Sequence, residues 1–501
     1  MTILKSSIEN NNIIKESISA NLGENVKKVN SFFSYPVNKD YLVKDICIQC
    51  LNRKATILCM NTIVDKEKIE NHIILPLMYT KLEDSHGDIG TILMEKVLTV
   101  NIVSKVNTYE DVIKGILDGD TVLFVNGYNE VLMIHTSKVQ HRGVEKPTVE
   151  NTLKGPQEAF TEWNEGNRSL IRKSLKDPGL ITEAISFGKD NHDEVFIMYI
   201  KNIVSVTLLK EVKTRISKII DKNIENASIL QQCIEDRPYS ILPSTFETER
   251  PDRVSSFLKE GHIALLIGST PNVVIVPVTF WTLFHTSEDT YQRWMYGNLL
   301  RAIRILAFFI SLFLPGVYIA LSTYHVDMIP TDLVIAIASS REKLPLPVIF
   351  EILLMEISFE LMREAGVRMP SSMGSTIGIV GALILGQAAV EATIVSPILV
   401  IIVALTGLSS FAIPEMNLSF LVRIGRFIFL IAGAVGGLYG VGLLATAFLT
   451  YACAFESFGI PFFSPKSPQK PSSKDFIMRR LVFKQNKKTI NINIQNVWKQ
   501  K

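Results

Sequence analysis

The pattern of hydrophobic and polar positions changes near residue 300. Before that point, short apolar runs alternate with amphipathic, charge-rich segments, a pattern typical of the strands and helices of an α/β fold. Beyond it, four runs contain no charged residue, and each is about 20 residues or longer, the length that crosses a bilayer. These runs cover residues 305–324, 369–390, 392–414 and 427–455. The pattern predicts an α+β N-terminal region followed by an all-α polytopic membrane region.

The N-terminal region contains an internal repeat. An apolar run at 57–64, followed by a charged helical pattern, recurs at 197–204, about 140 residues later. A second pair of matching segments, 117–134 and 259–276, has two β-rich runs around a short turn in each copy, which predicts a hairpin. We therefore expect two tandem α/β units. The predicted divisions are a disordered N-terminus (1–24), a first unit (25–142), a linker (143–166) and a second unit (167–280).

Aromatic residues precede the first charge-free run. Since Trp and Tyr favour the membrane–water boundary, segment 281–300 is predicted to lie at the membrane surface. The membrane region is predicted at 301–455, with four to six membrane helices. The number stays open because segment 418–455 is too long for one untilted span and barely long enough for two.

Composition and charge narrow the class of protein. The 501 residues are 47% hydrophobic and 20% charged, with a mean hydropathy of +0.24, which excludes an ordinary soluble enzyme and a disordered protein. Segment 456–501 holds 10 Lys and Arg but 2 acids, so a basic tail follows a mildly acidic body. Basic residues beyond a last span stay on the cytoplasmic side. Because no secretory signal opens the chain, both termini are expected in the cytoplasm. The tail lacks the fold motifs and clustered aromatics of a nucleic-acid binder.

No pattern in the chain predicts an enzyme, a metal site or a cofactor. The five cysteines are sparse and odd in number, which fits a reducing compartment. Cys47 and Cys50 lie three apart on a predicted strand and would point to opposite faces. Phosphate-loop, nucleophile-elbow and zinc-helix motifs are absent from the sequence. The duplicated units could enclose a ligand cleft or act as a scaffold for oligomer contacts, and the lack of a catalytic constellation favours the scaffold.

Acidic residues interrupt an apolar segment at 345–363. Glu351, Glu356 and Glu360 lie there, and the last two are spaced to share one helix face. Carboxylates at membrane depth normally line water or pair with cations. One hypothesis is an acidic vestibule that attracts cations once several subunits assemble. The other is an amphipathic helix on the membrane surface with its acids in water.

Small residues recur every four positions in the next apolar run and form one continuous ridge. Such ridges let helices approach closely in lipid. Gln387 and Glu391, also four apart, place a polar stripe beside the ridge. The combination suits a pore-lining or gating helix, or alternatively a tightly packed helix whose polar side chains bond to neighbours. The ridge consists of Gly374, Gly378, Ala382 and Gly386.

The segment between the first span and the acidic helix is too polar to lie in lipid. It is predicted to be a coupling loop that contains a short helix at 331–340. The candidate coupling residues are His325, Asp327, Pro330, Thr331, Arg341 and Glu342.

Many short motifs in the chain are similar to those of one known family. They include the residues at 155–162, 250–253, 275–280, 291–294, 328–331, 337–342, 354–360, 363–366, 386–390 and 457–461. The sequence resembles the A subunits of GerA-type spore germinant receptors over about residues 25–465. It departs from the family pattern at 164–167 and 343–346.

The resemblance implies a nutrient-sensing complex in the inner membrane of the dormant spore. Its other members would be a transporter-like B subunit that binds the nutrient and a lipoprotein C subunit. The A subunit would form a homo-oligomer that acts as a nutrient-gated ion channel. The alternative is a non-conducting signalling scaffold for the B and C subunits. A solute carrier acting alone is less favoured, because no pair of inverted membrane repeats is visible.

Overall fold

The computed structural model describes residues 16–81, 87–138, 154–188, 193–222, 224–368, 386–467 and 478–479, together with residues 147, 150, 152 and 481. These residues divide into two compact units. The α/β unit contains residues up to 238 and residues 245–277, and the helical unit contains residues 239–244 and the described residues from 278 onward. Each is described separately.

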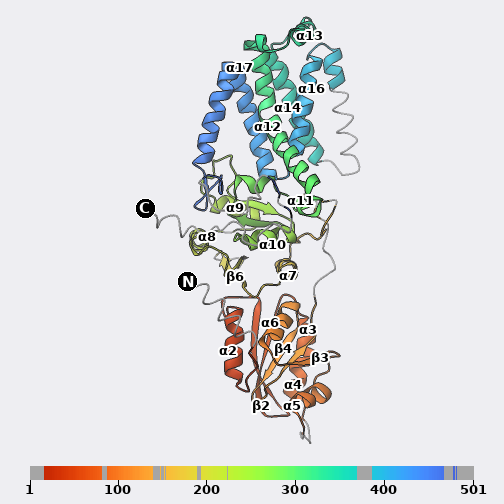
Figure 1. The fold of residues 1–501 in the computed structure, drawn as a ribbon, viewed down its shortest axis with the longest axis vertical. Coiled ribbons are helices and arrows are strands. Elements are labelled where there is room, and N and C mark those ends of the chain that lie inside the picture. The colour runs from red at the N-terminus through yellow and green to blue at the C-terminus, as the bar shows by residue number, and fades with distance from the viewer. Residues whose placement is uncertain are drawn as a thin grey trace. The chain divides into compact units, whose positions relative to one another are not determined.

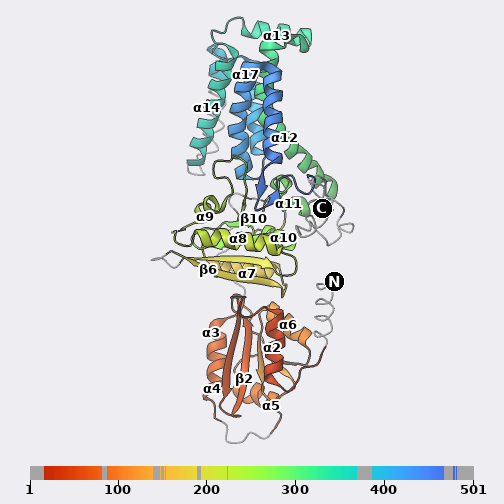
Figure 2. The same ribbon diagram turned by 90° about the vertical axis from the view of Figure 1, so that its left-hand side faces the viewer.

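Two five-stranded antiparallel sheets form the α/β unit (Figures 1 and 2). Their strand orders are β1-β2-β4-β5-β3 and β6-β7-β9-β10-β8, so the second sheet repeats the topology of the first. This confirms the predicted duplication. The first sheet consists of β1 (Tyr41–Ile48), β2 (Arg53–Met60), β3 (Val103–Val106), β4 (Thr121–Val125) and β5 (Val131–Ile134). The second consists of β6 (Leu180–Phe187), β7 (Asp193–Ile200), β8 (Phe246–Thr248), β9 (Ile263–Ile267) and β10 (Val273–Val276).

Helices cover both faces of the first sheet, which explains why β4 is buried along its whole length. One apolar cluster packs Leu123 and Ile57 against Leu77 and other helical residues, and a second packs Leu58 and Phe124 against the opposite helices. The helices of the two α/β copies are α2 (Leu22–Phe32), α3 (Lys66–Ile69), α4 (Leu75–Tyr79), α5 (Ile89–Ile92), α6 (Tyr109–Asp118), α7 (Asn164–Ser174), α8 (Val206–Lys218), α9 (Ala227–Ile234) and α10 (Pro251–Lys259). Two π-helical turns, Glu70–Ile74 and Leu93–Val97, continue α3 and α5.

The same glycine turn leads into a central strand in both copies. Gly119 has a φ of 94° and Gly261 a φ of 93°, a left-handed conformation that favours glycine. A Cβ atom on Gly119 would lie 2.9 Å from the carbonyl oxygen of Ile63, and one on Gly261 would lie 3.3 Å from that of Ile203. The sequence repeat therefore preserves a backbone requirement as well as an apolar pattern.

A buried polar cluster joins the two copies. Asp40, fully buried before β1, accepts hydrogen bonds from Arg172 Nε at 2.7 Å and Thr182 Oγ1 at 2.7 Å, and it also pairs with Arg168. Burial alone would raise the pKa of Asp40, but the guanidinium groups of Arg172 and Arg168 lower it below its usual value. The Lys39 amide donates to the Thr182 carbonyl at 2.9 Å. We call Asp40, Arg168, Arg172 and Thr182 the Asp40 cluster.

Two helices begin earlier than the predicted unit boundaries. α2 begins at Leu22 because the Asn21 side chain caps it, accepting from the Gly23 amide at 3.0 Å. α7 begins at Asn164, inside the segment predicted as a linker. The first residues of the predicted tail form a short hairpin, β11 (Glu456–Ser457) with β12 (Ile460–Pro461). Next to it, the Phe280 amide donates to the Phe462 carbonyl at 2.8 Å, both within the helical unit.

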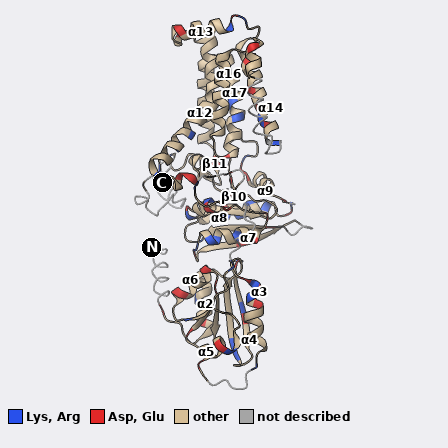
Figure 3. Cartoon of the chain, turned by 90° about the vertical axis from the view of Figure 1, so that its right-hand side faces the viewer, with Lys and Arg blue, Asp and Glu red and all other residues tan. Residues whose placement is uncertain are grey.

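The helical unit is built mainly from long apolar helices that carry few charged side chains (Figure 3). α12 has 31 residues and α17 has 38, and an 18-residue stretch of each has a mean hydropathy of 2.2 and 2.1 respectively, so both are long and apolar enough to cross a membrane. α16 is apolar but has 15 residues. The helices of this unit are α11 (Glu288–Tyr291), α12 (Trp294–Tyr324), α13 (Thr331–Arg341), α14 (Val348–Arg368), α16 (Pro397–Phe411) and α17 (Met416–Cys453), with 3₁₀ turns at Phe280–Phe284 and Val326–Met328.

α17 has two legs rather than one continuous axis. Gly437 has a φ of 59° and a ψ of −147°, which is not helical, and the chain bends there. Figure 1 shows the two legs in successive shades of blue. A Cβ atom on Gly440 would collide with the carbonyl oxygen of Ala432, so the legs approach closely. Segment 418–455 is too long for one untilted span, and the bend at Gly437 divides it into two shorter helical legs.

Gly316 allows α12 to contact α17 directly, and we expect Gly316→Ala to destabilise the helical unit. A Cβ atom at this position would lie 2.5 Å from the carbonyl oxygen of Phe429. Moving one helix away from the other costs about 1–3 kcal/mol. The measurement is thermal unfolding of the full chain in detergent micelles. Gly442→Ala, in α17, is the matched control because nothing lies within 4 Å of its Cβ position. Equal melting temperatures for both variants would contradict the close contact.

Candidate functional site

Three acidic residues of α14, Glu351, Glu356 and Glu360, point into the helical unit. Glu351 and Glu356 have no exposed surface. Glu356 and Glu360 are one helical turn apart and lie on the same side of α14. Because burying an unpaired carboxylate is costly, partners are expected close by.

Two arginines of α17 supply those partners. Arg426, also fully buried, lies 3.1 Å from Glu356 and 2.6 Å from Glu360. Arg423 donates through Nε to Glu360 at 2.9 Å. Arg423 and Arg426 are three residues apart, so α17 presents them on one face. Arg363, on α14 itself, lies 3.8 Å from Glu360 and also contacts Ser410 of α16.

These five side chains form the α14–α17 ion cluster, defined as Glu356, Glu360, Arg363, Arg423 and Arg426. Three guanidinium groups face two carboxylates, so the cluster carries a net charge of +1 when both acids are ionised. It therefore offers no excess negative charge to a cation. Its evident effect is to hold three helices together.

Glu351 makes a second link, toward the predicted coupling loop. Its Oε2 accepts a hydrogen bond from the Ser396 amide at 3.2 Å, and Arg341 lies 3.6 Å away at the end of α13. The Ser396 side chain in turn caps α16. Arg341 is thus connected through Glu351 to the start of α16.

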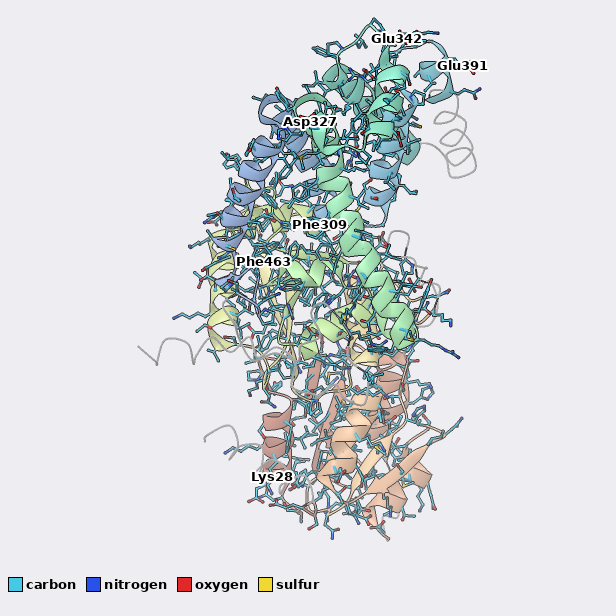
Figure 4. All side chains as sticks on the ribbon, turned by 45° about the horizontal axis from the view of Figure 1, so that its top comes forward. Lys28, Phe309, Asp327, Glu342, Glu391 and Phe463 are labelled. Carbon is cyan, nitrogen blue, oxygen red and sulfur yellow. The ribbon has the colours of Figure 1, made fainter. Side chains whose placement is uncertain are left out.

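The remaining predicted coupling residues are mostly exposed. The His325 ring lies 5.8 Å from the Tyr439 ring, centroid to centroid, in an edge-on arrangement. Asp327, Thr331 and Glu342 are exposed, and α13 contains no buried residue. Figure 4 shows Glu342 and Glu391 toward the same end of the helical unit. Pro330, also exposed, immediately precedes α13.

The predicted polar stripe is present and exposed. Gln387 donates to Glu391 at 2.8 Å within a helical segment at 386–391. Of the predicted small-residue ridge, Gly374, Gly378 and Ala382 lie outside the described residues. Gly386 is described, and a Cβ atom there would lie 3.7 Å from Val400.

Asp289 organises the entry into α12. It accepts from Arg301 Nε at 2.9 Å and Arg304 Nη1 at 2.7 Å, and its backbone carbonyl accepts from Arg479 at 2.7 Å. Burial favours a raised pKa for Asp289, but Arg304 and Arg301 outweigh burial and lower it. The first two arginines of the apolar helix are thus both paired with one acid that precedes it.

Comparison with known proteins agrees with the motifs. The family model described as Bacillus/Clostridium GerA spore germination protein matches residues 27–490. The chain belongs to the GerA family. It is 37% identical over 470 residues to spore germination protein KA of Bacillus subtilis, covering 93% of this chain and 85% of the relative. It is 38% identical over 426 residues to the uncharacterized membrane protein YfkQ of the same organism, covering 84% and 82%.

A solved structure is also similar to part of this GerA-family chain. The N-terminal domain of the A subunit of the Bacillus megaterium spore germinant receptor GerK3 matches with 27% identity and a TM-score of 0.42. The match covers 53% of this chain and 98% of that domain. The relatives are spore germination proteins and a membrane protein, and two long apolar helices indicate membrane association of this GerA-family chain as well.

Sequence reasoning found the acids of this GerA-family chain but missed their partners. Arg423 and Arg426 interrupt an apolar segment three residues apart, so they share one helix face, as Glu356 and Glu360 do with a spacing of four. Opposite charges on two predicted membrane helices were therefore visible. Their pairing depends on how α14 and α17 pack, which no local pattern encodes.

Proposed function

We propose that this GerA-family protein is the A subunit of a nutrient germinant receptor that triggers spore germination. It acts as an oligomeric ligand-gated ion channel in the spore inner membrane, with both termini in the cytoplasm. Its partners are a nutrient-binding, transporter-like B subunit and a lipoprotein C subunit. The role is non-enzymatic and needs no cofactor.

One observation carries the channel proposal. The described acids of α14 that point into the helical unit are neutralised by arginines, whereas Glu391 is exposed and bonded to Gln387. A carboxylate in an apolar region needs water or a neighbouring subunit. Large apolar side chains of α14 and α16 are also exposed, which provides surface for lipid or other copies of the chain. Several copies assembled around Glu391 and Gln387 would line a water-filled path.

The test is ion flux through the A, B and C subunits reconstituted in liposomes. A mixture of amino acids, sugars and nucleosides serves as the stimulus. We expect Glu391→Gln to reduce potassium flux at least about tenfold, because removing a pore-lining charge lowers the local cation concentration. Glu364→Gln is the matched control, since Glu364 is also exposed but pairs with Arg368 at 2.7 Å.

A non-conducting scaffold is the alternative, favoured by the α14–α17 ion cluster, in which each acid already pairs with an arginine. It predicts an assembled complex that carries no stimulated flux even with wild-type protein. Normal flux in Glu391→Gln and Gln387→Ala would reject the pore assignment while leaving a channel elsewhere in the protein.

A further inference from the structure

A cleft of about 1070 Å³ opens on the first sheet, beside helix α2. α2 covers the part of this face around Leu58, but it leaves the outer ends of β1 and β2 uncovered. Asp45 and Cys47 of β1 and Lys54 of β2 are exposed there. The volume is slightly above the upper end of the range for small-molecule sites, about 1,000 Å³.

Strand β1 borders the cleft with a free edge. It stands at the end of its sheet and pairs with β2 along all of Tyr41–Ile48, and no second strand pairs with it among the residues that the structure describes. Its outward amide and carbonyl groups form a row about 26 Å long at the usual rise per residue. Such an edge is a template for another extended chain.

Side chains of β1 alternate in a way that suits strand addition. Ile46 and Ile48 are buried in the core, while Asp45 and Cys47 face the cleft side. A segment paired with β1 would therefore place every second side chain over the cleft. Small solutes and nucleic acids lack the repeating amide and carbonyl groups that an open strand edge binds, so a polypeptide fits best.

The charge of the cleft indicates which charge its ligand should carry. Lys27, Lys54 and Lys201 line it and are exposed, whereas the one lining carboxylate, Asp45, accepts a hydrogen bond from Thr56 at 2.6 Å. Three ammonium groups thus face one satisfied acid, which favours an acidic ligand. Residues 1–15 contain two lysines and one acid, and residues 482–501 contain five lysines and no acid. The chain's own ends have the wrong charge.

Two apolar side chains provide contact area beside the lysines. Tyr35 and Val37 line the cleft and are 46% and 47% exposed. Tyrosine is among the residue types that anchor binding partners most often, and Val37 adds apolar contact area beside it. The second sheet has the same strand order but a smaller cleft, about 340 Å³, where Arg168 stacks over Phe196 at 4.1 Å.

We propose that the α2–β1 cleft binds an extended acidic segment of another protein, which adds to the free edge of β1 as a further strand. Acidic side chains of that segment would face Lys27, Lys54 and Lys201, and apolar ones would contact Tyr35 and Val37. This partner site is separate from the proposed channel and does not depend on it.

The probe is a random nine-residue peptide library displayed on phage and selected on the full chain in detergent micelles. We expect enriched peptides to alternate acidic and apolar residues. A synthetic copy of the best peptide is then titrated against wild-type protein and against K27E/K54E, in which we expect affinity to fall at least about tenfold. K96E/K114E is the matched control. Lys96 and Lys114 are also exposed, but they lie on helical segments of the first copy that do not line the cleft.

A second peptide tests the strand pairing itself. N-methylation at alternate residues removes the amide donors but keeps every side chain, so we expect it to abolish binding. Equal affinity for the methylated peptide would overturn strand addition. The proposed site would be wrong if the selection did not enrich acidic peptides, or if K96E/K114E lost as much peptide affinity as K27E/K54E. Unchanged thermal unfolding of K27E/K54E shows that its loss of binding is not a loss of folding.

Discussion

Replacing Arg426 with methionine is expected to destabilise the helical unit by about 3–5 kcal/mol, because the change leaves a buried charge without its partner. Arg426 and Glu356 are both fully buried and lie 3.1 Å apart. Methionine fills much of the same volume but cannot compensate the carboxylate. The measurement is thermal unfolding of the full chain in detergent micelles, together with its abundance in the membrane fraction.

Two further variants separate the charge from the packing. E356Q/R426M removes both members of the pair, so we expect it to recover most of the lost stability. R368M breaks an exposed pair on the same helix α14, where Arg368 and Glu364 are 78% and 56% exposed, and such pairs contribute less than about 1 kcal/mol. If R426M unfolds at the same temperature as R368M, the α14–α17 ion cluster does not hold these helices.

Much of the α/β fold could be predicted because its information is local and repeated. The apolar runs at 57–64 and 197–204 contain the last residues of β2 and β7 and the turns that follow them. Most residues of both strands are buried. The turn glycines Gly119 and Gly261 occupy the same place in each copy. Two occurrences of one pattern constrain each other, so the duplication was visible without a structure.

The pairing of charges could not be predicted in the same way. Asp40 and Arg172 are 132 positions apart, and Glu360 and Arg423 are 63 apart. Burial and spacing show that a charge needs a partner, but the choice among many opposite charges follows from how whole elements pack. The acidic vestibule and the surface helix were both hypotheses about unpaired acids, and neither considered arginines from another helix.

The two ion clusters have a common physical role. Each buries a charge that would be unfavourable alone and that is compensated when two separate elements dock in one arrangement. The Asp40 cluster joins the two α/β copies, and the α14–α17 ion cluster joins helices of the apolar region. Removing one partner should therefore affect the docking more than the folding of either element.

Asp40→Asn is the second change for which we expect a large effect, about 3–5 kcal/mol. The asparagine keeps the shape of the side chain, but it leaves the buried Arg172 guanidinium, 3% exposed, without a counter-charge. In either orientation its NH2 group would also face a guanidinium donor, because Arg168 now donates to one oxygen of Asp40 and Arg172 Nε to the other. We expect a lower unfolding temperature and faster hydrogen exchange at the Lys39 amide, which bonds the Thr182 carbonyl across the junction.

Asp118→Asn provides the matched control for that measurement. Asp118 also pairs across the two copies, with Lys176 at 2.6 Å, but the two side chains are 39% and 54% exposed. Solvent screens such a pair, so its loss should cost less than about 1 kcal/mol and leave exchange at Lys39 unchanged. If both variants shift stability equally, burial of the Asp40 cluster is not what joins the copies. A large shift in Asp40→Asn with unchanged exchange at Lys39 would instead place the damage within the first copy.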